Sequence, residues 1–170
     1  MNEVLTRWNG LSSEEAAGEI LACCGSSNWA LRMAAQRPIH DEFALLTACD
    51  ETWESLAESD WQEAIHSHPR IGERKATSDA AARSTAWSEE EQRKVSTASE
   101  DVKNAIAEGN RAYERRFDRV FIVCATGKSA PEILEILQKR LRNDPVAEIH
   151  ETAEQLRQIT HLRLKKWLSS

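Results

Sequence analysis

A single strand-like run in an otherwise helical sequence constrains the fold of this chain most strongly. Residues Arg119 to Ala125 (Arg-Val-Phe-Ile-Val-Cys-Ala) form the only stretch dominated by β-branched and aromatic residues. One strand cannot form a sheet, and backbone groups that are buried do not stay unpaired. We therefore expect an all-α fold in which this run crosses as an extended segment. Its amides and carbonyls would bond to side chains, to water or to a ligand.

Apolar residues elsewhere recur at helical spacing. Ser12 and Glu15 have capping-box spacing before a run that ends at Gly25, and Pro131 suits the first turn of a helix capped by Ser129. The pattern predicts helices over about 13–24, 28–36, 41–56, 60–67, 88–117, 129–141 and 146–168. We expect a helical bundle of about seven to nine helices in a single domain over residues 1–170, with 73–87 as a polar connector containing a helical piece near 79–84.

Charge and cysteine usage argue against several classes of function. The net charge is −6 and the basic residues are interspersed with acidic ones, whereas nucleic acids and anionic membranes require a concentrated positive face. No apolar run is long enough to cross a membrane and no leader precedes the first helix, so a cytoplasmic protein is expected. The four cysteines have no metal-ligand spacing, which predicts reduced, buried thiols.

His68 is the first candidate for chemistry. Pro69 keeps His68 out of helical backbone geometry, so the imidazole would project from a stiff turn at the end of a helix. Such a residue suits proton transfer near neutral pH, although a helix that simply ends at His-Pro is the structural alternative. His66 and His68 also form a His-x-His pair, but no third ligand lies at recognisable spacing, so a metal site is only weakly supported.

Four other polar residues fall on faces that should be apolar. The inner face of the predicted 88–117 helix, followed back to its first turn, carries Ser88, Glu91 and Gln92; the alternative is that Ser88 and Glu91 form a capping box. Arg163 lies in the apolar stripe of the last helix, where an arginine needs an anionic partner or must reach solvent at the edge of the bundle. His68, Glu91 and Arg163 together would suffice for proton-transfer chemistry on a small polar ring without a metal.

Six motifs, in this order along nearly the whole chain, resemble the 2-oxo-4-hydroxy-4-carboxy-5-ureidoimidazoline (OHCU) decarboxylases. They are Ser-His-Pro-Arg-Ile-Gly at 67–72, Ser-x-x-Glu-Gln at 88–92, Asn-x-x-Tyr-x-x-Arg-Phe at 110–117, Phe-Ile-Val-Cys-Ala-x-Gly-Lys-Ser at 121–129, Arg-Leu-x-Asn-Asp at 140–144 and Leu-x-x-Ile-x-x-Leu-Arg-Leu at 156–164. The chain departs from many members at Asp118, where they have glycine. Because Asp tolerates a left-handed backbone comparatively well, we expect that turn to survive.

The resemblance implies an all-α, cofactor-independent decarboxylase that forms (S)-allantoin in the last step of uric acid degradation. It also implies a homodimer whose only ligand is the small-molecule substrate, with no cofactor and no metal. His68 would be the acid–base residue, with Glu91 and Arg163 beside it in the catalytic site. Substrate-binding positions would be Pro69, Ser88, Gln92 and the backbone of Phe121, Ile122, Val123, Cys124 and Ala125.

Two other functions remain open from the residues alone. One is a metal-dependent hydrolase that uses His66 and His68. The other is a non-enzymatic helical module that binds a ligand, in which Glu91 and Arg163 would form a buried structural pair.

Overall fold

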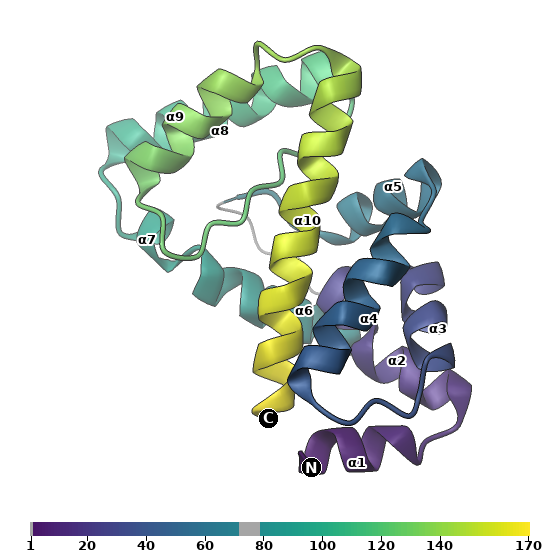
Figure 1. Cartoon of the computed structure of the whole chain (residues 1–170). Helices are drawn as coiled ribbons and strands as arrows, with labels where there is room; N and C mark the ends of the chain where they lie inside the picture. Colours follow the sequence, from purple (N-terminus) through teal and green to yellow (C-terminus); the bar gives the residue numbers. More distant parts are fainter. Residues whose placement is uncertain (1, 72–78) are drawn as a thin grey trace. The chain divides into compact units, whose positions relative to one another are not determined.

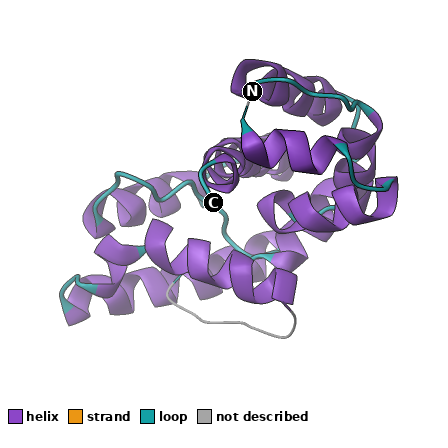
Figure 2. Cartoon of the chain, turned by 90° about the horizontal axis from the view of Figure 1, so that it is seen from below, coloured by secondary structure: helices purple, strands orange, loops and turns teal. Residues whose placement is uncertain are grey.

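Ten α-helices form the regular structure of the part of the chain that this computed structural model describes, residues 2–71 and 79–170 (Figure 1). They are α1 (Glu3–Asn9), α2 (Ser13–Cys24), α3 (Ser27–Ala35), α4 (Glu42–Glu54), α5 (Glu58–Ser67), α6 (Asp79–Glu91), α7 (Arg93–Ser96), α8 (Glu100–Phe117), α9 (Ala130–Arg140) and α10 (Pro145–Leu168). None of the described residues forms a β-strand (Figure 2). The predicted all-α class is confirmed.

Local capping signals placed several helix ends correctly. Ser12 and Glu15 form the capping box expected for α2, and Gly25 ends that helix in the left-handed conformation. Ser129 and Glu132 form a second capping box at the start of α9, with a proline in its first turn. Helix α5 begins at Glu58 rather than near Asp60, whose carboxylate accepts a hydrogen bond from the Ala57 amide at 2.9 Å.

The predicted helix over 88–117 is wrong, because the structure divides that stretch among α6, α7 and α8. The hydroxyls of Ser96 and Thr97 donate to carbonyls three residues back, and such bonds compete with a continuing helix. Ser99 then caps α8 by accepting from the Val102 amide. Ser88 and Glu91 therefore lie in the last turn of α6, not in a first-turn capping box, and this division together with α1 explains why there are more helices than seven to nine.

Part of the predicted connector is also helical. Helix α6 covers its residues from Asp79 onward, which extends the helical piece expected near 79–84. Positions 72–78 lie outside the described residues.

The expected left-handed turn at Asp118 is present. Its φ of 53° and ψ of 37° end α8, and its amide donates to the Glu114 carbonyl. The chain then enters the extended segment, whose residues 120–125 are neither helix nor strand.

The chain divides into two compact units. Unit 1 comprises Met1–Ala64 with Arg157–Ser170, and unit 2 comprises Ile65–Leu156. The single-domain organisation stays a prediction. Among the described residues, no helix combines the length and the hydropathy needed to cross a bilayer.

The core of unit 1 contains tryptophans and thiols. Trp8 and Trp167 meet edge to face, with ring centroids 5.5 Å apart, and the Trp8 indole donates to the Ala16 carbonyl. All four cysteines are buried and outside any disulfide, as predicted; Cys23, Cys24 and Cys49 belong to unit 1, whereas Cys124 belongs to unit 2. Burial raises the pKa of both Cys24 and Cys49 to about 12, so these thiols are held neutral.

The core of unit 2 joins α8 and α9 to the extended segment. At Gly109 of α8 an added Cβ would lie 2.6 Å from a Leu137 methyl group, so glycine is what allows the two helices to approach this closely. The apolar cluster of this unit consists of Ile71, Val95, Ile106, Tyr113, Phe117, Phe121, Val123, Ala125, Ala130, Ile133 and Leu137.

Candidate functional site

His68 lies in unit 2 immediately after the last residue of α5. Its amide still donates to the Ile65 carbonyl at 3.1 Å, but Pro69 follows and the helix ends. The side chain is only 4% exposed, and its Nδ1 lies 3.3 Å from the Ser67 hydroxyl. The expected arrangement, a histidine fixed at a helix end, is therefore observed, and it is removed from bulk solvent.

Ile71, three residues beyond His68, connects this turn to two other parts of unit 2. Its side chain belongs to the apolar cluster that contains Phe121, Val123 and Ala125. It also lines a cavity of about 710 Å³ together with Ser88 and Gln92. Three sequence regions predicted to surround the substrate are thus linked through one buried residue.

The turn that carries His68 is tied to α8. Arg70 forms a two-point ion pair with Glu114, in which Nη2 donates to Oε2 at 2.9 Å and Nε donates to Oε1. Asn110 donates to the Ile71 carbonyl at 3.4 Å. Both contacts were missed from the sequence, although Asn110 and Arg70 lie inside motifs that carried the resemblance.

The predicted residues on α6 occupy different depths. Ser88 is buried, whereas Glu91 and Gln92, at the end of the helix and just after it, are half-buried. Ser88 and Gln92 share the cavity wall; the contact of Glu91 with substrate stays a prediction.

The extended segment is buried throughout residues 121–125. Side chains from elsewhere in unit 2 bond to its backbone: Arg140 donates to the Ile122 carbonyl, and the Cys124 amide donates to Gln155 Oε1 at 2.9 Å. Lys128 Nζ donates to the Cys124 carbonyl at 2.7 Å. The prediction that groups outside the segment would form hydrogen bonds with its buried backbone is confirmed for these three backbone atoms.

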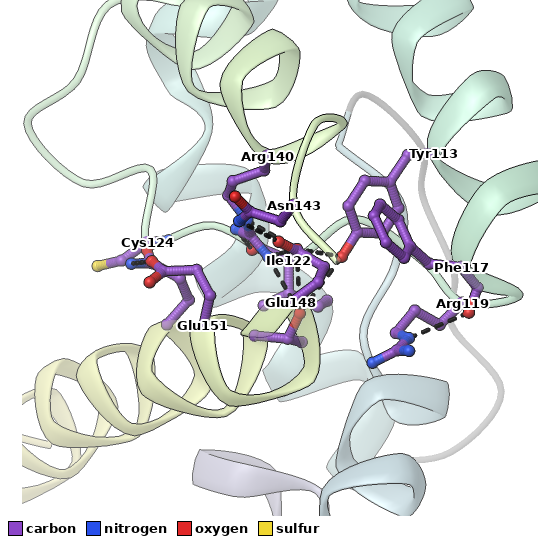
Figure 3. A network of polar contacts seen from close by, with 11 residues as sticks. Tyr113, Phe117, Arg119, Ile122, Cys124, Arg140, Asn143, Glu148 and Glu151 are labelled. Atoms are coloured by element: carbon purple, nitrogen blue, oxygen red, sulfur yellow. Dashed lines mark hydrogen bonds and ion pairs between the residues drawn. The ribbon is translucent and has the colours of Figure 1, made fainter. Parts of the chain in front are cut away.

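A buried polar network supports Arg140 (Figure 3). Glu148 Oε1 accepts from Arg140 Nε at 2.8 Å and Nη2 at 2.5 Å, and Tyr113 donates to the same oxygen at 2.5 Å. Asn143 donates to the other carboxylate oxygen at 2.9 Å, and Thr152 accepts from Arg140 at 3.0 Å. Burial, then the hydrogen bond to Glu148, raises the pKa of Tyr113 to about 12. The network fixes a carboxylate and a cation inside the core of unit 2.

Arg163 belongs to unit 1. It is 1% exposed, which confirms that it faces inward, and its Nη1 donates to the Ala22 carbonyl at 3.3 Å. Its convergence with His68 and Glu91, which belong to unit 2, stays a prediction.

The His-x-His pair splits between two environments. His66 is exposed on α5, whereas His68 is buried. Within residues 2–71 and 79–170, no group of three or more histidine, cysteine or carboxylate side chains is placed to hold a metal ion.

Comparison with known proteins gives consistent matches. A model of the OHCU decarboxylase family matches residues 9–165. The uric acid degradation bifunctional protein TTL of Arabidopsis thaliana is 33% identical over 162 residues, which are 94% of this chain and 49% of that protein. The chain therefore spans about half the length of this curated relative.

Solved structures extend the likeness to three dimensions. The crystal structure of an OHCU decarboxylase in the presence of (S)-allantoin is 29% identical, with a TM-score of 0.75 over 89% of this chain and 98% of that one. The crystal structure of an (S)-allantoin synthase is 16% identical, with a TM-score of 0.68 over 96% of this chain and 53% of that one, and shares the fold. Because the family model covers most of its length, the chain belongs to the OHCU decarboxylase family.

Proposed function

We propose that this protein catalyses the cofactor-independent decarboxylation of OHCU to (S)-allantoin, the last step of uric acid degradation. Family membership over residues 9–165 carries the proposal. His68 is buried three residues before Ile71, and Ile71 lines the cavity together with Ser88 and Gln92; both observations support the proposal.

The substrate itself supplies the electron sink. Its carboxylate is attached to a carbon next to a ring C=N, so the electron pair of the breaking C–C bond moves into the imine as CO2 leaves. Two protons are then delivered to the ring, one to the former imine nitrogen and one to the carbon that bears the ureido group, while the hydroxyl loses its proton and becomes a carbonyl. This chemistry needs acid–base groups and orientation, and it requires no pyridoxal, thiamine or metal.

His68 is assigned the central proton transfer. We place its imidazole against the hydroxyl on the reacting carbon, where it shuttles the hydroxyl proton. A buried imidazole on a fixed turn suits this role because its orientation does not have to be established during each turnover. Glu91 would hold ring N–H groups or deliver the second proton.

The remaining residues are assigned to orientation. Pro69, Ser88 and Gln92 would line the substrate, and backbone groups of residues 121–125 would bond to its ring and ureido groups. A fixed ring orientation determines which face receives the proton, and hence the handedness of the product.

Arg163 is assigned to binding rather than to clamping the leaving carboxylate. A cation on that carboxylate would stabilise a charge that disappears during the reaction and would oppose catalysis. We place Arg163 against Glu91 or against a ring or ureido carbonyl. A homodimer and a cytoplasmic location are further parts of the proposal.

The test uses freshly generated OHCU and follows the circular dichroism of the allantoin formed. Spontaneous decay gives racemate, whereas the enzyme is expected to give the (S) enantiomer. Racemic product at the uncatalysed rate would refute the decarboxylase assignment and favour a non-enzymatic ligand-binding module. Activity abolished by exhaustive chelation and restored by a metal would instead favour a metal-dependent enzyme.

His68→Ala should lower kcat by about 10²–10⁴-fold with the fold intact, because a positioned acid–base group contributes on this order. His66→Ala is the matched control, since the same side chain is removed two residues away at an exposed position. Near-normal turnover in His68→Ala would remove this residue from the mechanism.

A further inference from the structure

The extended segment is held along one edge. Three of its backbone groups bond to side chains: the Ile122 carbonyl to Arg140, the Cys124 amide to Gln155, and the Cys124 carbonyl to Lys128. All three groups belong to residues 122 and 124. In an extended backbone the N–H and C=O of one residue point to one side, and those of the next residue point to the other. Arg140, Gln155 and Lys128 therefore occupy the side faced by the even-numbered residues.

Membership of the apolar cluster of unit 2 follows the same alternation. Phe121, Val123 and Ala125 all enter the apolar cluster of unit 2, whereas Ile122 and Cys124 do not belong to it. The polar backbone groups of Phe121 and Val123 must then face away from Arg140 and Gln155.

The opposite edge carries the backbone groups of Phe121 and Val123. Within the part of the chain that the structure describes, neither the N–H nor the C=O of Phe121 or Val123 takes part in a hydrogen bond, although both residues are buried. Buried backbone groups are nearly always paired. Val123 thus offers one donor and one acceptor on the same side of the segment, which is what a ring with N–H and C=O groups requires.

We propose that Arg140 and Gln155 are positioning residues that fix which edge of the segment faces the substrate. They occupy the Ile122 carbonyl and the Cys124 amide, and so present the N–H and C=O of Val123 to the ring and ureido groups. This inference rests on the proposed decarboxylase function. Neither side chain touches the substrate; both act through the backbone.

The two positioning residues differ in how they can be tested. Arg140 is buried in its ion pair with Glu148, so its removal would also disturb the core. Gln155 is half-buried on α10, where its Nε2 donates to Glu151 Oε1 at 3.0 Å. Gln155→Leu removes the acceptor for the Cys124 amide while leaving the Arg140–Glu148 pair in place.

The experiment compares Gln155→Leu with the exchanged pair Glu151→Gln/Gln155→Glu, in which a carboxylate accepts the Cys124 N–H and the amide at position 151 donates to it. Gln155→Leu should raise the KM for OHCU about tenfold, the factor that corresponds to loss of one orienting hydrogen bond. The enantiomeric excess of allantoin, after subtraction of spontaneous decay, should fall. The exchanged pair should restore both values, and Glu151→Gln alone should change neither.

Hydrogen exchange at the Cys124 amide gives a readout that is independent of turnover. The amide should exchange slowly in the wild type and in the exchanged pair, and faster in Gln155→Leu. If the wild type does not turn over OHCU, the proposed function and its substrate assignment fail. If the wild type is active and Gln155→Leu keeps the wild-type KM and enantiomeric excess, the positioning role is refuted. A lower kcat with unchanged KM and enantiomeric excess would refute it as well, because partial unfolding alone produces that pattern.

Discussion

Each unit contains a carboxylate that binds an arginine, but the surroundings of the two pairs differ. In unit 2, Glu148 and Arg140 have side chains 0% and 4% exposed and lie 2.5 Å apart. In unit 1, Asp50 is 44% exposed and the same oxygen lies 2.8 Å from both Arg157 and His161. The distances are similar, so the energetic difference must come from solvent. Water screens the Asp50 pairs, whereas Glu148 and Arg140 depend on each other for compensation of charge.

The buried pair also contacts the backbone of the extended segment. Arg140 bonds at the same time to Glu148 and to the Ile122 carbonyl, so the charge network of unit 2 reaches the backbone of the extended segment. The Asp50 carboxylate accepts from Arg157 and His161 and so links α4 to α10. The buried pair thus acts on a segment of the candidate site, whereas the carboxylate of the exposed pair connects two helices.

Glu148→Ala is expected to have the largest effect on the free energy of unfolding. This change leaves the Arg140 guanidinium buried without its carboxylate and should lower the free energy of unfolding by about 3–5 kcal/mol. Urea denaturation of the wild type and the variant measures it. The double variant Arg140→Met/Glu148→Leu removes both charges and should be much less destabilised than Glu148→Ala; a single variant within about 1 kcal/mol of the wild type would show that the pair is not effectively buried.

A smaller effect is expected for Tyr113→Phe. The variant keeps the ring but removes the donor to Glu148, and should cost about 1–2 kcal/mol at pH 7. Equal urea midpoints for the two proteins would contradict this.

Tyr113→Phe also tests how the stability of the buried network depends on pH under alkaline conditions. The pKa of Tyr113 is raised from 10.0 to about 12 in the folded protein, so the folded state keeps a proton that the unfolded chain loses. The contribution of the protonated Tyr113 hydroxyl to the free energy of unfolding is complete below pH 10 and is lost as the pH rises from 10 to 12. The buried thiols of Cys24 and Cys49 titrate in an overlapping range, so the test is the difference between the wild type and Tyr113→Phe, which should shrink over this interval.

The smallest effect is expected for Asp50→Ala in unit 1. Removing a partly exposed partner of Arg157 and His161 should change the free energy of unfolding by about 0–1 kcal/mol, and 1 M salt should reduce the difference further. Thermal unfolding at low and high salt measures both. A loss comparable to that of Glu148→Ala would remove the distinction between the two regions.

The candidate site was predictable where one local rule applied. Pro69 indicated that His68 would leave the helix, and the helical wheel indicated that Arg163 would face inward. Ser88 was correctly expected to be buried, but for the wrong reason, since it lies in the last turn of α6 instead of opening a long helix. Periodicity alone could not find that break, because the decisive signals are hydroxyls that bond back to the chain and a competing cap at Ser99.

Arg140 shows what sequence reasoning missed. It follows Lys139 in the last turn of α9, where basic residues are favoured by the helix dipole and need no further explanation. Its position three residues after the core residue Leu137 was the available signal for burial. Nothing local indicated that Glu148, in the next helix, would lie at 0% exposure beside it.

The amino-acid sequence by itself determined the all-α class, several of the helix caps, the absence of helix over residues 120–125 and the family, because each follows from contacts within a few residues or from ordered motifs. Only the tertiary structure decided which carboxylate Arg140 binds, which helix carries Ser88, and which edge of the extended segment is occupied. These outcomes depend on groups distant in the chain, and their energies are set by burial, which local sequence does not specify.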